Sequence, residues 1–95
     1  MINYADGCLQ VEGHLTMDTV PALYEQGLQH LKQNELILDF SKVETADSSA
    51  VSMLLGWTRA AKQNKCEVSV VNLPSSMLSL AGLYGVSDLL PVQVN

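Results

Sequence analysis

Two runs of alternating apolar and polar residues open the chain. Ile2–Ala5 and Cys8–Leu15 are separated by Asp6-Gly7, a residue pair typical of a tight hairpin turn. In the second run, Leu9 and Val11 fall on one side and the polar residues fall on the other. The pattern predicts a hairpin whose second strand has one covered face.

A helical period follows the hairpin. Asp18 or Thr19 is suited to cap a helix, and Pro21 is tolerated in a first helical turn. The apolar positions then recur three and four residues apart: Val20, Leu23, Tyr24, Gly27, Leu28 and Leu31. Glycine inside a helix costs up to about 1 kcal/mol against alanine, so we expect a neighbouring element to pack closely at Gly27.

The remaining chain alternates strands with helices. Leu36–Phe40 has almost no alternation, which predicts a central strand covered on most sides. A helix is expected from residue 47 to about residue 63, and a valine-rich strand over Glu67–Leu73. A short helix should begin at Pro74-Ser75 and stop at Gly85. The last residues, SDLLPVQVN, are expected to form an edge strand or to lie along the body.

This order of elements predicts an α/β fold. Helices that connect strands imply right-handed crossovers and a mixed, mostly parallel sheet. We expect four to five strands, with the hairpin at the N-terminus and about three helices packed against the sheet. The chain has 95 residues and shows no repeat or linker, so residues 1–95 are expected to form a single domain.

Charge and composition narrow the classes of function. Ten acidic and five basic residues give a net charge of -5, and the basic residues form no dense run, so nucleic-acid binding is not expected. No stretch approaches the ~20 apolar residues of a membrane span, and no leader or lipidation signal is visible. We expect a soluble, cytoplasmic protein without direct membrane insertion. Charged residues make up only 16% of the chain, which indicates a surface that another protein covers.

Residues that carry chemistry are sparse. Cys8 and Cys66 lie far apart, without the spacing of a zinc site or a disulfide framework, and are expected to be buried, reduced thiols. His14 and His30 show no spacing that pairs them with a nucleophile, and the phosphate-loop pattern GxxxxGK[ST] is absent. We therefore expect no catalytic residue, no metal site and no enzymatic activity.

The most informative stretch is LILDFSKVETADSSAVSMLLGW, residues 36–57, in which an apolar strand runs through a polar turn into an apolar helix. Asp47, Ser48 and Ser49 are all good N-cap residues, although one of them suffices to cap the helix. Three interpretations stay open for the serines: helix caps, a site for phosphate at a helix N-terminus, or part of a docking surface.

The faces of that helix differ in character. At about 100° per residue, the core-facing stripe comprises Val51, Leu54, Thr58 and Ala61, and the wet stripe comprises Ser48, Ser52, Arg59 and Gln63. Met53 and Trp57 continue the apolar arc to one side. Either the last helix covers this flank, or Met53 and Trp57 are exposed as the anchor of an interface.

The segment LDFSKVETADSSAVSMLL resembles the signature of STAS domains (sulphate transporter and anti-sigma factor antagonist), in which Asp-Ser-Ser-Gly or Asp-Thr-Gly-Gly opens the helix. The resemblance covers nearly the whole chain and implies the STAS (SpoIIAA-like) fold. Ala50 stands where the family has glycine, so it fills space where a partner backbone would approach.

Two branches of the family imply different partners. EGHLTMDTVPALYEQG and the brief C-terminus are more similar to the small STAS subunit of the Mla phospholipid ABC transporter, which binds the transporter's cytoplasmic ATPase and thereby, indirectly, its permease. In that branch the motif hydroxyl matches Ser48, and the partner-binding residues would be Ser48, Ser49, Ala50, Met53 and Trp57. In anti-sigma factor antagonists, a partner serine kinase phosphorylates the second serine, here Ser49. The resemblance leaves nucleotide binding near Ser48 and Ser49 open and implies no other cofactor.

Overall fold

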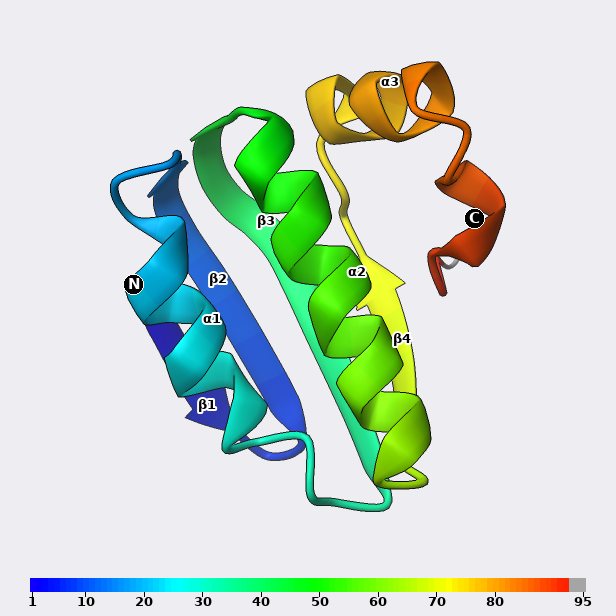
Figure 1. Ribbon diagram of the computed structural model, residues 1–95. Coiled ribbons are helices and arrows are strands. Elements are labelled where there is room, and N and C mark those ends of the chain that lie inside the picture. Colours follow the sequence, from blue (N-terminus) through cyan, green and yellow to red (C-terminus); the bar gives the residue numbers. More distant parts are fainter. Residues whose placement is uncertain (93–95) are drawn as a thin grey trace.

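One mixed sheet of four strands organises the protein (Figure 1). The computed structural model describes residues 1–92. Strand β1 (Ile2–Ala5) pairs antiparallel with β2 (Cys8–Leu15), which runs parallel to β3 (Glu35–Ala46). Strand β4 (Glu67–Val71) runs parallel to β3 and completes the order β1-β2-β3-β4. The mixed, mostly parallel sheet predicted from the order of elements is confirmed.

Two residues with positive φ shape the hairpin turn. Asp6 and Gly7 have φ angles of 51° and 79°, which is the sign that a type I′ turn requires at both central positions. The turn sets the register in which Ala5 lies opposite Cys8 and Ile2 lies opposite Val11. The hairpin predicted from Asp6-Gly7 is confirmed.

Three α-helices accompany the sheet in residues 1–92. Helices α1 (Val20–Leu28) and α2 (Ser48–Gln63) lie side by side on one face of it, and α3 (Ser75–Leu83) lies beyond the carboxyl end of β4 (Figure 1). The helix expected from residue 47 to about residue 63 is confirmed, with Asp47 as the N-cap and Ser48 as the first helical residue. The first helix ends sooner than its apolar period suggested, since the buried Leu31 lies in the turn that follows α1.

The chain after α3 returns to the sheet. A 3₁₀ turn (Ser87–Leu89) leads to Val92, which forms an isolated parallel bridge with Val70 of β4. The predicted tail therefore meets the sheet edge, and its last three residues, 93–95, fall outside the described part of the chain. Among residues 1–92, no helix combines the length and apolar character needed to cross a membrane.

The helices cover only one face of the sheet. Leu36, Leu38 and Phe40 of β3 are buried beneath them, whereas Ile37 is 44% exposed on the opposite face. Strand β3 lies centrally between β2 and β4, as predicted, but the prediction that it is covered on most sides is wrong. The apolar side chain of Ile37, on the uncovered face, concealed the alternation that a sheet with one covered face normally shows.

Gly27 allows α1 and α2 to pack closely. A Cβ atom at this position would lie 2.7 Å from Nε1 of Trp57 and closer still to the adjoining ring carbons, so the expected close neighbour is confirmed. The Trp57 ring is fully buried and has no space to move aside. We expect Gly27→Ala to lower the free energy of unfolding by about 1–3 kcal/mol, although alanine favours a helix.

Gly82 in α3 provides the matched control, because a Cβ atom there meets nothing within 4 Å. Urea denaturation followed by circular dichroism should find Gly82→Ala unchanged or stabilised by up to about 1 kcal/mol. Equal stabilities of the two alanine variants would contradict the close packing at Gly27.

Candidate functional site

The first turn of α2 is capped from within the chain. One carboxylate oxygen of Asp47 accepts the backbone N–H of Ser49 at 2.8 Å and also accepts the Ser49 hydroxyl. The other oxygen accepts the backbone N–H of Met17 at 3.3 Å. Asp47 is therefore the N-cap residue of α2, and it also ties the turn before α1 to the start of α2.

The same carboxylate changes what this helix end can bind. A helix N-terminus attracts anions because its N–H groups and its dipole favour negative charge. Here Asp47 supplies that negative charge, and the hydrogen bonds it accepts, above all from the Ser49 hydroxyl, lower its pKa so that it stays ionised. A phosphate or nucleotide would meet this charge, which disfavours a phosphate site at the serines.

The ionised carboxylate of Asp47 should make the free energy of unfolding depend on pH in the acidic range. Because the pKa of Asp47 is lowered in the folded state, its ionised form stabilises the fold above the unfolded pKa of about 3.9, and this contribution is lost as the pH falls through the folded pKa. Asp47→Asn keeps a good cap but does not titrate.

We therefore expect the difference in unfolding free energy between wild type and Asp47→Asn to be constant above about pH 5 and to shrink below about pH 4. Thermal denaturation at a series of pH values measures it. A difference that persists unchanged to about pH 2 would contradict a role for the ionised carboxylate.

The serines of α2 have different surroundings. Ser48 is exposed at the first helical position, whereas Ser49 is half-buried with its hydroxyl on Asp47. Ser52, one turn further on, is exposed on the same side of the helix as Ser48. A protein that approaches this end of α2 would therefore meet Ser48 and Ser52 before Ser49.

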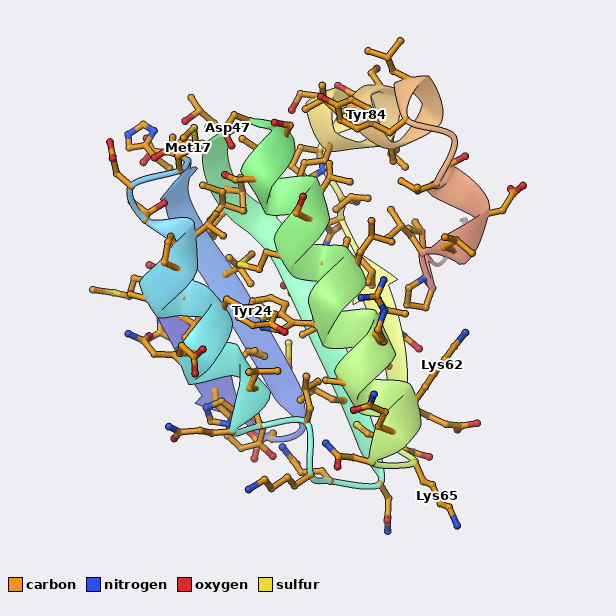
Figure 2. All side chains as sticks on the ribbon, in the orientation of Figure 1. Met17, Tyr24, Asp47, Lys62, Lys65 and Tyr84 are labelled. Atoms are coloured by element: carbon orange, nitrogen blue, oxygen red, sulfur yellow. The ribbon has the colours of Figure 1, made fainter. Side chains whose placement is uncertain are left out.

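A surface groove lies beside these serines, between α1 and α2. It has a volume of about 320 Å³ and is lined by three residues of each helix: Val20, Pro21, Tyr24, Ser49, Ser52 and Met53. Most of this lining is apolar. The Tyr24 ring packs against α2 at Gly56, where a Cβ atom would lie 2.7 Å from the ring (Figure 2). The groove thus combines an apolar floor with hydroxyl groups along one wall.

Three of the residues expected to meet a partner are buried. Ala50 and Trp57 have no exposed surface, and Met53 is 2% exposed. Trp57 donates its indole N–H to the backbone carbonyl of Tyr24 at 3.0 Å, so α1 covers this flank, and not the last helix. The prediction that Met53 and Trp57 are exposed as an anchor is wrong because the apolar face of α1 seals them. Met53 reaches the surface only as part of the groove lining.

Sequence reasoning missed the wall of the groove that α1 provides. The sequence pattern predicts Pro21 in a first helical turn and Tyr24 in an apolar stripe, and neither pattern indicates a groove. The signal that could have found Tyr24 is Gly56, because a glycine inside a helix indicates a close neighbour, as Gly27 did.

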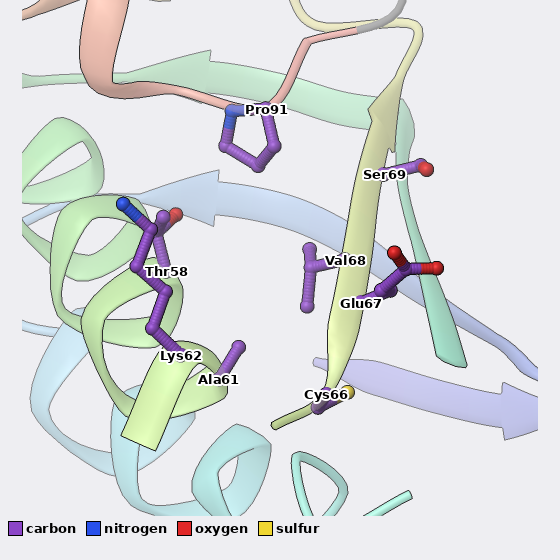
Figure 3. Close-up of a pocket in the computed structure, with 8 residues that line it drawn as sticks. All are labelled: Thr58, Ala61, Lys62, Cys66, Glu67, Val68, Ser69 and Pro91. Carbon is purple, nitrogen blue, oxygen red and sulfur yellow. The ribbon is translucent and has the colours of Figure 1, made fainter. Parts of the chain in front are cut away.

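A second cavity, of about 380 Å³, lies at the other end of α2 (Figure 3). Side chains of α2 form one side of it, and β4 and the returning tail form the rest: Thr58, Ala61, Lys62, Cys66, Glu67, Val68, Ser69 and Pro91. Burial raises the pKa of the Cys66 thiol, which therefore stays protonated and weakly nucleophilic. This lining offers no histidine to act as a base.

Cys8 and the two histidines line neither of these two cavities. Cys8 and Cys66 are free thiols, Cys66 buried as expected and Cys8 only half-buried. The exposed His14 lies 2.7 Å from the Thr45 hydroxyl, and His30 stacks on Tyr4. Within residues 1–92, no group of three or more histidine, cysteine or acidic side chains could hold a metal ion.

Comparison with known proteins identifies one family and one fold. The family model described as "Mlab, STAS domain" matches residues 2–91. No curated protein matches the chain. Among solved structures, an anti-sigma factor antagonist from Mycobacterium paratuberculosis is similar at 21% identity and a TM-score of 0.80, over 100% of this chain and 84% of that one.

Two structures of SpoIIAA are also similar. The anti-sigma factor antagonist SpoIIAA in its unphosphorylated form shares 15% identity at a TM-score of 0.72, over 100% of this chain and 88% of that one. The phosphorylated form of the Bacillus cell fate determinant SpoIIAA shares 16% identity at a TM-score of 0.71, over 100% of this chain and 91% of that one. At these identities the likeness shows a common fold, which confirms the predicted STAS (SpoIIAA-like) architecture.

Proposed function

Because this chain belongs to the family of Mlab, STAS domains, we propose that it is a non-catalytic interaction module that binds and regulates the ATPase of a phospholipid ABC transporter. STAS domains act in protein–protein interactions, and the family description supports the transporter branch. In this role the protein is cytoplasmic, contacts the permease only through the ATPase, and contributes to outer-membrane lipid asymmetry.

The observation that carries the proposal is the groove between α1 and α2, with the exposed Ser52 in its wall and the exposed Ser48 one turn before it on α2. Its apolar lining would lose contact with water when a partner docks, which favours association. Ser48 and Ser52 can then exchange hydrogen bonds with the partner. Ala50, Met53 and Trp57 contribute by fixing the two helices relative to each other, since their side chains are buried.

The module would regulate the ATPase through the surface that α1 and α2 form together. Trp57 joins α2 to α1, and the Asp47–Met17 hydrogen bond joins the start of α2 to the turn before α1, so the two helices present one rigid surface. A rigid surface loses little conformational entropy on binding and can stabilise one arrangement of the ATPase over another. The module would act by biasing assembly or activity of the ATPase, without chemistry of its own.

Co-purification tests this role. The tagged chain should retain the ATPase subunit of the phospholipid transporter of the same organism, and the permease with it, as identified by mass spectrometry. Retention of an anti-sigma factor with serine kinase activity, and of no transporter subunit, would overturn the proposal.

The second candidate is an anti-sigma factor antagonist switched at Ser49. Its support is that the similar solved structures include such antagonists, one of them in both phosphorylation states. A phosphoryl group on Ser49 would bring nearly two negative charges against Asp47 and displace the hydroxyl from the cap. Stoichiometric phosphoserine at Ser49 in protein purified from its own cells would favour this candidate.

A further inference from the structure

The outer edge of β4 is only partly paired. The backbone N–H of Glu67 bonds to the Asn34 carbonyl on the β3 side, and the N–H of Val70 bonds to the Pro91 carbonyl of the returning tail on the other side. Because the backbone groups of alternate strand residues point to opposite sides, those of Val68 point outward as those of Val70 do. Within residues 1–92, neither the N–H nor the C=O of Val68 has a hydrogen-bond partner.

The free part of this edge is short. Val92 bridges Val70, so the tail covers the carboxyl end of β4 and leaves residues 67–69 as the free edge. Unpaired backbone groups at an edge are a template on which another strand can form. A second copy of β4, which has five residues, would reach the place that Val92 fills. The free edge is therefore better suited to a short segment of a different protein.

The free edge opens into the cavity between α2 and β4, here called the α2–β4 cavity. Val68 points toward Thr58 and Ala61 of α2, whereas Glu67 and Ser69 point to the other side of β4 (Figure 3). A cavity of about 150 Å³ accepts a benzene-sized ligand, so the volume of about 380 Å³ here has room for an aliphatic side chain. A strand that paired with Val68 would direct alternate side chains into this cavity.

Charged side chains lie on both sides of the free edge. In the lining of the α2–β4 cavity, Lys62 comes from α2 and Glu67 from β4, and both are exposed. Across residues 1–92 the one ion pair between side chains joins His14 to Glu44, so neither charge is neutralised within the protein. Cys66 adds no charge to the lining, because burial raises the pKa of its thiol.

The α2 side of this cavity is predominantly basic. Arg59 lines an adjoining hollow of about 150 Å³, which shares Thr58 and Lys62 with the α2–β4 cavity. Lys65 is exposed in the turn between α2 and β4, and the exposed Asp88 of the 3₁₀ turn lines neither hollow. An acidic side chain is therefore favoured on the α2 side of an incoming strand, and a basic one on the Glu67 side.

We propose that the free edge of β4 receives an extended segment of a partner protein by strand addition. The backbone of this segment bonds to the N–H and C=O of Val68. One apolar side chain enters the α2–β4 cavity, an acidic side chain on the same face lies toward Lys62, and a basic side chain between them lies toward Glu67. In this mode the main-chain bonds supply affinity and the alternate side chains supply specificity. The site is separate from the α1–α2 groove and does not depend on the function proposed above.

Two blocked peptides, Thr-Asp-Lys-Val-Thr and Thr-Val-Lys-Asp-Thr, present this pattern in the two possible strand directions. Titration of the isotope-labelled chain with at least one of them should shift the amide signals of residues 67–69 to saturation. Exchange of Asp and Lys within that peptide should weaken binding about threefold or more. No saturable shift with either peptide up to about 10 mM, where even millimolar affinity is detected, would overturn the inference.

Two variants of the chain locate the bound segment. Lys62→Glu changes an exposed residue and should weaken peptide binding about three- to tenfold at low salt. Lys42→Glu is the matched control, because it changes the net charge equally at an exposed position of β3 outside the α2–β4 cavity, and should bind like wild type. Val68→Pro removes the outward N–H, is tolerated at such an edge position, and should weaken binding about tenfold or more.

Thermal denaturation establishes that each variant is folded before binding is compared. Unchanged affinity in Lys62→Glu, or a loss in Lys42→Glu as large as in Lys62→Glu, would overturn the inference. A dimer of this chain that ultracentrifugation detects and Val68→Pro disrupts would assign the free edge to a second copy and would overturn it as well.

Discussion

Trp57→Ala is expected to lower the free energy of unfolding by about 3–5 kcal/mol, the range for truncating a fully buried tryptophan. The ring has no exposed surface, it fills the space that Gly27 leaves open, and its indole N–H bonds to the Tyr24 carbonyl. A domain of this size is stable by roughly 5–15 kcal/mol. The variant should therefore be close to unfolding at room temperature.

Leu83→Ala provides the control, because Leu83 is 78% exposed on α3 and its truncation should change stability by less than about 0.5 kcal/mol. Urea denaturation followed by circular dichroism compares the variants, since Trp57→Ala removes the only tryptophan. If Trp57→Ala is as stable as Leu83→Ala, the ring is not part of the core. The expected result also means that lost binding by Trp57→Ala would report unfolding, so docking must be tested at exposed positions.

Ser52→Trp is expected to weaken binding to the ATPase by about 10- to 100-fold, which corresponds to about 1.4–2.8 kcal/mol. Ser52 is exposed and lines the groove, so a tryptophan there would occupy the space into which a partner side chain should enter. Its stability should change little, because the side chain is not in the core.

Gln63→Trp places the same side chain at an exposed position at the far end of α2, outside the groove. We expect it to bind like wild type. Denaturation of both variants separates lost binding from lost folding. Undiminished binding by Ser52→Trp would show that the partner docks elsewhere.

Local signals were sufficient for the hairpin and for α2, but not for β3: the polar turn expected after Phe40 is wrong, because the strand continues through these residues to Ala46 and pairs with β2. The hairpin follows from Asp6-Gly7, and the two predicted stripes of α2 are confirmed, with Leu54 and its stripe buried and Arg59 and its stripe exposed. The turn and the stripes depend on residues that are close together in the chain, so they can be predicted from the local sequence.

The relations between distant elements could not be predicted in the same way. Trp57 is buried because Gly27, thirty residues earlier, brings α1 against it, and nothing in the apolar period of α2 states which element covers which flank. Ile37 is apolar yet lies on the uncovered face of the sheet, because α1 and α2 both pack on the opposite face (Figure 1). The groove was missed for the same reason, since half of its wall comes from α1.

The most direct test of the docking surface is amide chemical-shift mapping of the isotope-labelled chain during titration with the ATPase subunit. We predict that the largest changes fall on residues 20–24 of α1 and 47–53 of α2, with little change at Ile37 and its neighbours on the uncovered sheet face. Changes confined to that sheet face or to α3, with residues 47–53 unaffected, would contradict the account.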